Sequence, residues 1–156
     1  MKFLTQLCSV TMAGVFILGT STISVSAFGN DLFWERGFGQ GTAEALITRG
    51  PGNSIYVACE AGSGRPSSIS FSLAGRRPTG SRLTMTFDDN DPEQIWVSDG
   101  VITSNCRACA GNFDYVISGL KQHASVHILF ENGDGARFSL DGSSEAIGEC
   151  TAGFYQ

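Results

Sequence analysis

Proline, histidine and basic residues are scarce in this sequence of 156 residues. It contains four prolines, two histidines, and ten lysines and arginines against fifteen aspartates and glutamates, which gives a net charge of −5 at pH 7. An acidic surface repels phosphate groups, which argues against nucleic acid or anionic lipid as a partner. The sequence also lacks an internal repeat, so it does not indicate a solenoid or a propeller.

No apolar run is long enough to suggest an integral membrane segment, which requires about 20 consecutive apolar residues. The most apolar stretch, residues 10–18, instead belongs to a pattern typical of an export signal, with Lys2 before it and small residues at 25–27 after it. We therefore expect residues 1–27 to be a signal peptide that is cleaved from a bacterial protein of the periplasm or the exterior. Removal of Lys2 leaves nine basic and fifteen acidic residues, a net charge of −6.

Glycine is abundant, with 20 residues, and indicates frequent turns. Three glycines alternate with other residues at Gly37, Gly39 and Gly41, so we predict a flexible glycine-rich N-terminal arm over residues 28–42. Residues 43–156 are numerous enough to bury one core. We predict that they form a single β-rich domain.

Apolar and polar residues alternate through much of this predicted domain, which is the pattern of half-buried strands. The clearest inward stripes are Ile55, Val57 and Cys59; Ile69, Phe71 and Leu73; Leu83, Met85 and Phe87; and Val126, Ile128 and Phe130. Turn residues separate them, and Asp99-Gly100 favours a tight hairpin between residues 94–97 and 101–104. The pattern predicts a mainly β protein, an antiparallel β-sandwich or small barrel whose consecutive strands form a meander.

Two segments change to helical spacing. Phe113, Val116, Ile117 and Leu120 fall at i, i+3, i+4 and i+7, and Asn112 is a candidate N-cap for that short helix. Residues 143–150 suggest a second short helix, with Ser143 as its cap and Ala146, Ile147 and Cys150 facing inward.

Four cysteines follow the signal segment, and in an oxidising compartment an even set is most simply paired. Four thiols allow three pairings. We favour Cys59 with Cys150 and Cys106 with Cys109, because Cys59 lies on an inward stripe and Cys150 follows the last predicted helix. The first bond would tie the end of the domain to the sheet, and the second would close a small loop.

The Cys106-x-x-Cys109 motif also allows two functional interpretations. A redox-active pair requires its first thiol at a helix N-terminus, where the dipole favours the thiolate. Gly111 lies between the motif and the helix predicted over 113–120, so we do not expect the first thiol at the helix N-terminus. No βαβ pattern surrounds the motif. A four-thiolate zinc site requires two close pairs, and this sequence has one. We therefore predict neither a metal nor a cofactor.

The remaining candidate residues carry no known catalytic pattern. His123 and His127 lack the glutamate of a zinc-protease motif, and the acidic group at residues 88–93 lacks the spacing of a calcium loop. Exposed aromatic residues favour interfaces, so Trp34, Phe38 and Trp96 are our candidate binding residues.

From residue 54 onward the layout resembles a set of small exported bacterial proteins, including the invasion-associated locus B family and the VasI/TagO-like accessory proteins of type VI secretion. The resemblance is carried by an apolar strand that ends in cysteine at 55–59, by residues 83–88 and 113–120, and by residues 138–142 leading to Cys150. It implies a periplasmic or secreted β-rich domain whose terminal helix is clipped by a disulfide, without catalytic residues to transfer.

Together these observations predict an exported, non-enzymatic interaction protein with a protein partner in the envelope or the host, and with a role in virulence or secretion. One alternative is an inhibitor or immunity-type protein in which the acidic loop at 88–93 enters the basic cleft of a cell-wall hydrolase or toxin. A second alternative is a thiol-redox protein that uses Cys106 and Cys109. The sequence carries no signal for an oligomeric state.

Overall fold

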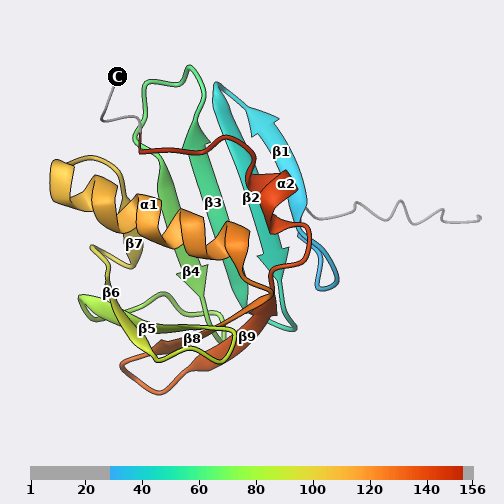
Figure 1. Ribbon diagram of the computed structural model, residues 1–156, viewed down its shortest axis with the longest axis vertical. Helices are drawn as coiled ribbons and strands as arrows, with labels where there is room; N and C mark the ends of the chain where they lie inside the picture. The colour runs from blue at the N-terminus through green and yellow to red at the C-terminus, as the bar shows by residue number, and fades with distance from the viewer. Residues whose placement is uncertain (1–28, 153–156) are drawn as a thin grey trace, which may run out of the picture.

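The structure is a computed structural model that describes residues 29–152, and the predicted signal peptide lies outside this range. The described chain folds into two antiparallel sheets and two helices (Figure 1). The five-stranded sheet has the order β1-β2-β3-β4-β7, and its strands are β1 Glu35–Gly39, β2 Thr42–Thr48, β3 Ser54–Glu60, β4 Ser68–Ser72 and β7 Val101–Thr103. The four-stranded sheet has the order β6-β5-β8-β9, and its strands are β6 Glu93–Trp96, β5 Arg82–Phe87, β8 Ser125–Phe130 and β9 Gly135–Ser139.

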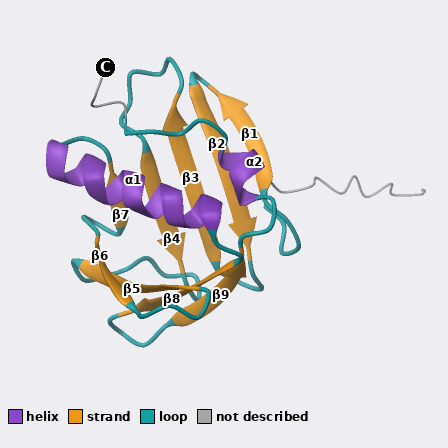
Figure 2. Cartoon of the chain, viewed as in Figure 1, coloured by secondary structure: helices purple, strands orange, loops and turns teal. Residues whose placement is uncertain are grey.

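The helices lie on one side of the larger sheet. Helix α1, Arg107–Gln122, runs across the face of this sheet and above the smaller sheet, and the short helix α2, Ser143–Ile147, packs on β1 and β2 (Figure 2). The ring of Phe87, from β5, lies directly against Gly119 of α1, so the helix bridges the two sheets. The mainly β class is therefore confirmed, and the described residues form two open sheets rather than a closed barrel.

The alternating stripes of the sequence form the core. Strand β3 buries Ile55, Val57 and Cys59, and the corresponding positions of β4, β5 and β8 are buried in the same way. Helix α1 contributes its apolar face through Phe113, Val116 and Leu120 among others. Burial of apolar side chains between sheets and helix is the dominant favourable term in such a fold.

The predicted flexible arm over residues 28–42 needs correction. Residues 35–39 form strand β1, which pairs with β2 from Glu35 opposite Leu46 to Gly39 opposite Thr42. The two-residue turn at Gln40 and Gly41 has positive φ at both positions, 51° and 73°, as tight hairpins prefer. The alternating glycines thus supply a hairpin and an edge strand.

The predicted meander is also wrong where consecutive strands lie in different sheets, including from β4 to β5 and from β6 to β7. Strands β6 and β7 follow one another through the Asp99-Gly100 turn, but only a single bridge, Ser98 with Val101, joins the two sides of that turn. Strand β6 pairs with β5, whereas β7 pairs with β4 in the other sheet. The Asp99-Gly100 turn is therefore one of the places where the chain passes from one sheet to the other.

Both helix starts differ from the prediction. Helix α1 begins six residues before Phe113, and its N-cap is Cys106 rather than Asn112. Helix α2 has Gly142 as its N-cap, and Ser143 is its first residue, with its hydroxyl buried and donating to the carbonyl of Leu120 at 2.6 Å. The Ser143 side chain thus bonds to a residue of α1 that is distant in sequence, and it does not cap its own helix as the sequence predicted.

Candidate functional site

The Cys106-x-x-Cys109 pair forms a disulfide at the first turn of α1. The backbone of Cys106 is extended, with φ −144° and ψ 162°, and its Sγ accepts the backbone N–H of Cys109 at 3.1 Å. No acidic residue lies in the first turn of the helix, and Arg107 between the two cysteines is exposed. The positive end of the helix dipole therefore faces the sulfur of Cys106 without a nearby carboxylate from the same turn.

The early start of α1 removes one of the two arguments that the sequence gave against a redox-active pair. We expected Gly111 to separate the cysteines from the helix, but Gly111 lies within α1 and is exposed. Ala108 and Ala110 are strong helix formers, and they are the sequence signal that indicates the longer helix.

A groove lies beside this disulfide, between the start of α1 and the passage from β6 to β7. Its volume is about 230 Å³, and its lining is mainly apolar. The lining residues are Trp96, Val97, Ser98, Val101, Ile102, Thr103, Ala108, Cys109 and Asn112. Val97 and Ile102 belong to the core as well, so the groove has a rigid base. We call this feature the Trp96 groove.

Trp96 is the aromatic residue in the lining of the groove, and 58% of its surface is accessible. The guanidinium carbon of Arg82 lies 4.5 Å from the centre of the Trp96 ring, which is a cation–π arrangement. The side-chain amide of Asn112 donates to the Trp96 carbonyl at 2.9 Å. The first contact orients the Trp96 ring, and the second joins the backbone of β6 to α1.

Another exposed aromatic residue, Tyr115, follows Asn112 along α1. Its hydroxyl donates to a carboxylate oxygen of Glu93, and this hydrogen bond is the main cause that raises the pKa of Tyr115 above its usual value. Glu93 lies on the same strand as Trp96, so α1 and β6 are joined by two side-chain contacts.

The other two candidate binding residues lie elsewhere. Trp34 is 6% exposed, and its indole N–H donates to the Ser139 carbonyl at 3.1 Å, so this residue belongs to the core. Phe38, on the edge strand β1, is 71% exposed. The structure therefore does not bring the three predicted aromatics into one surface, and it removes Trp34 from the set.

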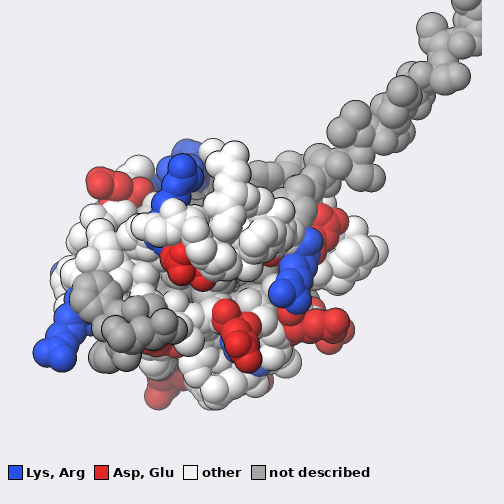
Figure 3. Space-filling view, turned by 90° about the horizontal axis from the view of Figure 1, so that it is seen from above, with Lys and Arg blue, Asp and Glu red and all other residues white. Residues whose placement is uncertain are grey.

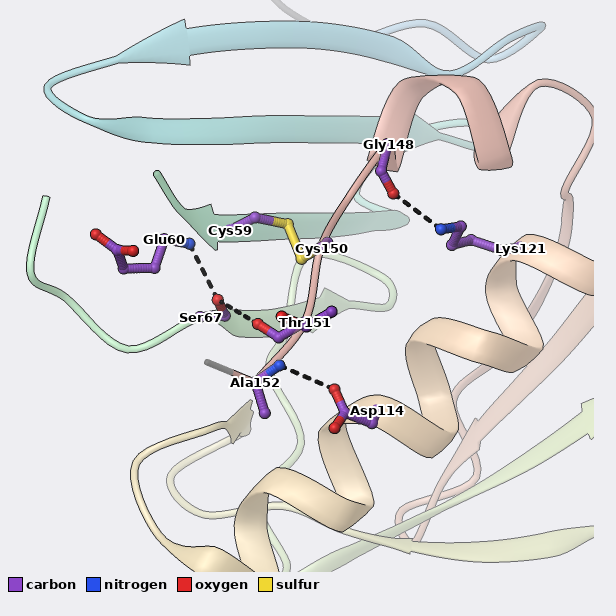
Figure 4. The surroundings of a disulfide bond; sticks show 9 residues. All are labelled: Cys59, Glu60, Ser67, Asp114, Lys121, Gly148, Cys150, Thr151 and Ala152. Atoms are coloured by element: carbon purple, nitrogen blue, oxygen red, sulfur yellow. Dashed lines mark hydrogen bonds between the residues drawn. A yellow bond between two sulfur atoms is a disulfide. The ribbon is translucent and has the colours of Figure 1, made fainter. Parts of the chain in front are cut away.

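The second disulfide, between Cys59 and Cys150, holds the end of the described chain against the sheet (Figure 4). The two cysteines are 91 residues apart in sequence, and their sulfurs are buried among core residues. Ser67 accepts the backbone N–H of Glu60 at 3.0 Å and donates to the Thr151 carbonyl at 3.3 Å. The Cys59–Cys150 disulfide and these two hydrogen bonds therefore join the end of the described chain to β3 and to Ser67, the residue preceding β4.

Helix α1 holds the same segment from its other side. Asp114 accepts the backbone N–H of Ala152 at 2.9 Å, and Lys121 donates to the Gly148 carbonyl at 2.9 Å (Figure 4). Both predicted cysteine pairings are confirmed.

A second hollow, of about 430 Å³, lies on the face of the larger sheet that no helix covers. Tyr56 donates a hydrogen bond to Glu44 within it, and Glu60 and Arg65 lie at its margin. Partial burial, followed by the hydrogen bond to Glu44, raises the pKa of Tyr56 to about 12. Sequence reasoning missed this hollow, because Tyr56 and Glu44 are brought together only by the pairing of β2 and β3.

Of the two histidines and the acidic cluster at residues 88–93, His123, Asp88 and Glu93 make side-chain hydrogen bonds within the protein. His123 Nδ1 lies 2.9 Å from Asp88 Oδ2, and His127 is half-buried on β8. Within residues 29–152, no three histidine, cysteine, aspartate or glutamate side chains gather where they would hold a metal ion. Acidic and basic side chains are interspersed on the face that Figure 3 shows.

These features define a disulfide-stapled two-sheet β domain with a C-x-x-C pair exposed beside an apolar groove. In the part of the chain that the structure describes, none of the helices has the length and apolar character for crossing a membrane. The chain belongs to the YfjT family, whose model matches residues 33–147. No curated protein and no solved structure matches it.

Proposed function

We propose that this member of the YfjT family is an exported recognition protein that binds a polypeptide segment of an envelope or host protein in the Trp96 groove. The observation that carries the proposal is an apolar groove with an exposed, oriented tryptophan at its margin. Tryptophan is enriched among residues that dominate binding energy, especially where apolar neighbours exclude water around it.

The chemistry of the groove defines the segment that it fits. Val97, Val101 and Ile102 offer apolar surface for an apolar side chain. Arg82 on the Trp96 ring and the exposed Arg107 place two positive charges near the groove of a protein whose net charge is −5. We therefore propose a segment in which an apolar residue stands next to aspartate or glutamate, since complementary charge favours the correct partner.

Export is part of the proposal. Two disulfides in one small domain are typical of an oxidising compartment, and they support the signal peptide predicted over residues 1–27. Cell fractionation followed by N-terminal sequencing tests this part directly. We expect the mature protein in the periplasm or the medium, with Phe28 as its first residue, and a cytoplasmic full-length protein would contradict the proposal.

Site-specific photocrosslinking in the native envelope tests the groove. Benzoylphenylalanine in place of Trp96 should give a protein adduct, and the same probe in place of Phe38 is the matched control on a distant exposed site. Mass spectrometry of the adduct should locate a segment with an apolar residue beside a carboxylate. Identical adducts from both positions, or a basic segment at position 96, would contradict the proposal.

The recovered segment then permits a direct measurement. As a synthetic peptide, it should bind the purified protein at least ten times more weakly after Trp96→Ala, because removal of a central aromatic residue costs about 2 kcal/mol or more. The Phe38→Ala variant should bind it like the wild type. An unchanged dissociation constant for Trp96→Ala would show that binding occurs elsewhere.

The alternative of an inhibitor with an acidic loop at residues 88–93 receives less support. Asp88 accepts hydrogen bonds from the backbone N–H groups of Ala124 and Ser125, and Glu93 accepts one from Tyr115. Two of the acidic side chains in that loop are therefore engaged within the protein. Asp88 is half-buried, whereas Asp89, Asp91 and Glu93 are exposed.

A further inference from the structure

We infer that the Cys106–Cys109 disulfide is redox-active and exchanges with a disulfide of a polypeptide, with Cys106 as the attacking sulfur of the reduced form. This inference goes beyond recognition by the Trp96 groove: the reactivity of Cys106 does not require the groove, and only the choice of a polypeptide as substrate rests on the proposed function. It rests on the position of the motif in α1, on the difference between the two disulfides of this molecule, and on the surface beside the motif.

The position of Cys106 favours its thiolate. After reduction, the sulfur remains at the N-cap of a helix of 16 residues, where the dipole and the free N–H groups stabilise negative charge. The N–H of Cys109 already points at that sulfur, at 3.1 Å. Arg107 adds a positive charge in the first turn, which contains no acidic residue.

The two disulfides differ in access. Exchange requires an incoming sulfur to reach one sulfur of the bond. Cys59 and Cys150 are 3% and 5% exposed, whereas Cys106 is exposed and Cys109 is half-buried. An incoming thiolate can therefore approach Cys106 from solvent, but it cannot reach the other disulfide without opening of the core.

Reduction of the exposed bond also leaves the fold intact. Cys106 and Cys109 are three residues apart, and the hydrogen bond from the Ala110 N–H to the Cys106 carbonyl, at 2.7 Å, holds the first turn independently of the sulfurs. The bond between Cys59 and Cys150 closes a loop with a sequence separation of 91. The Cys59–Cys150 disulfide thus stabilises the fold, whereas the Cys106–Cys109 disulfide can be reduced and formed again without unfolding.

The surface beside the motif indicates a polypeptide as the substrate class. Ala108 and Cys109 form one side of the Trp96 groove, and Val101 and Ile102 lie in the same lining. An apolar segment in this groove would lie next to the resolving sulfur, with its own disulfide within reach of Cys106. A small polar disulfide would react with Cys106 without use of the groove.

The exchange proceeds in two balanced steps. The Cys106 thiolate attacks one sulfur of the substrate disulfide, so a Cys106–substrate bond forms, the substrate S–S bond breaks, and the other substrate sulfur leaves as a thiolate that takes a proton from water. Cys109, after loss of its proton to water, attacks Cys106 Sγ and releases the second substrate thiolate. The substrate gains two electrons and becomes a dithiol, and Cys106–Cys109 becomes the disulfide. A second protein dithiol returns the motif to its reduced form by the same steps.

The first experiment measures which disulfide opens. The purified full chain is titrated with dithiothreitol, quenched by alkylation and mapped by mass spectrometry. Cys106 and Cys109 should be alkylated at a dithiothreitol concentration at least tenfold below that required for Cys59 and Cys150, with an unchanged circular dichroism spectrum. Simultaneous opening of both bonds, or opening of Cys59–Cys150 first, would overturn the inference.

The second experiment measures which sulfur attacks, with glutathione disulfide as the probe. The reduced Cys109→Ser variant should form a glutathione adduct at Cys106 at about pH 6 at least five times faster than the same variant unfolded in guanidinium chloride. The Cys106→Ser variant, in which Cys109 is the free thiol, is the matched control and should show no such acceleration. Equal rates for folded and unfolded Cys109→Ser would overturn the inference.

A third arm separates this inference from the proposed function. Phe38→Ala, outside the groove, should leave the rates with glutathione disulfide and with a disulfide-bonded apolar peptide unchanged. Trp96→Ala should lower the rate with that peptide at least threefold more than the rate with glutathione disulfide, because only the peptide uses the groove. Loss of that difference would contradict the groove, while the glutathione rates would still decide whether Cys106 is reactive.

Discussion

Asp88 and His123, 35 residues apart in sequence, lie within 2.9 Å of each other where α1 ends. The other oxygen of the same carboxylate accepts the backbone N–H groups of Ala124 and Ser125, at 3.0 and 2.8 Å. Asp88 therefore ties the turn after β5 to the connection between α1 and β8. The hydrogen bond with His123 is the main cause that holds the pKa of Asp88 below its usual value, and the backbone donors add to it.

This arrangement predicts a loss of stability in acid. Because the folded-state pKa of Asp88 lies below its unfolded value of 3.8, its contribution is present above that value and is lost as the pH falls through the folded-state pKa. Urea unfolding between about pH 6 and about pH 3 should show a smaller decrease in free energy for Asp88→Asn than for the wild type. Asp89→Asn, at the exposed neighbour, is the control, and equal slopes for all three proteins would contradict the prediction.

The two disulfides should differ in their effect on stability. Replacement of Cys59 and Cys150 by serine should lower the free energy of unfolding by about 4–5 kcal/mol, because the unfolded chain regains the freedom of a long loop. Replacement of Cys106 and Cys109 should cost at most about 2 kcal/mol by the same argument. Urea denaturation of both double variants measures this, and the reverse order of stabilities would refute the assignment of the staple.

Two glycines of α1 give a matched pair of substitutions. A methyl group at Gly119 would overlap the ring of Phe87, whereas nothing lies within 4 Å of the same group at Gly111. We expect Gly119→Ala to destabilise the protein by about 1–3 kcal/mol through overpacking. Gly111→Ala should stabilise it by up to about 1 kcal/mol through helix propensity. Thermal unfolding of the two variants tests the packing of α1 on β5, and similar effects of both would argue against that contact.

Tyr56 should lose its phenol proton at a higher pH than an ordinary tyrosine. Its pKa of about 12 means that the folded state keeps the neutral phenol, so the stability that it contributes is present below pH 10.0 and is lost as the pH rises toward 12. Glu44→Gln removes the carboxylate that accepts its hydrogen bond, and should lower the pKa without restoring 10.0 fully, because partial burial is the larger cause. Ultraviolet titration measures this, with Tyr56→Phe to identify the signal. An unchanged midpoint in Glu44→Gln would contradict the assigned contact.

Much of the fold could be predicted from local pattern. Alternation over residues 55–59 and 83–87 identifies buried faces, because side chains in a strand point to opposite sides. The helical spacing from Phe113 to Leu120 likewise identifies the buried side of α1. Alternation does not name the neighbour of a strand, however, so it did not place β6 and β7 in different sheets.

The candidate site was predictable only in part. Cys106, Cys109 and Trp96 were identified from the sequence, but their proximity depends on the packing of the first turns of α1 beside β6 and β7. Trp34 was misplaced for a related reason. A tryptophan near a glycine-rich segment gives no local sign that its indole N–H will reach the carbonyl of Ser139, 105 residues later.

The sequence by itself determined that this protein is mainly β and that a helix covers residues 113–120, and it favoured Cys59–Cys150 and Cys106–Cys109 among three possible pairings. The first two properties follow from periodicity, which acts over short windows, and the favoured pairing follows from the positions of the cysteines in the predicted elements. Only the tertiary structure decided that Cys106 caps α1, that β1 is a strand, and that an apolar groove adjoins the exposed disulfide. The groove joins segments distant in sequence, β1 packs against α2, and α1 packs against β7, so no local pattern contains the energy of these contacts.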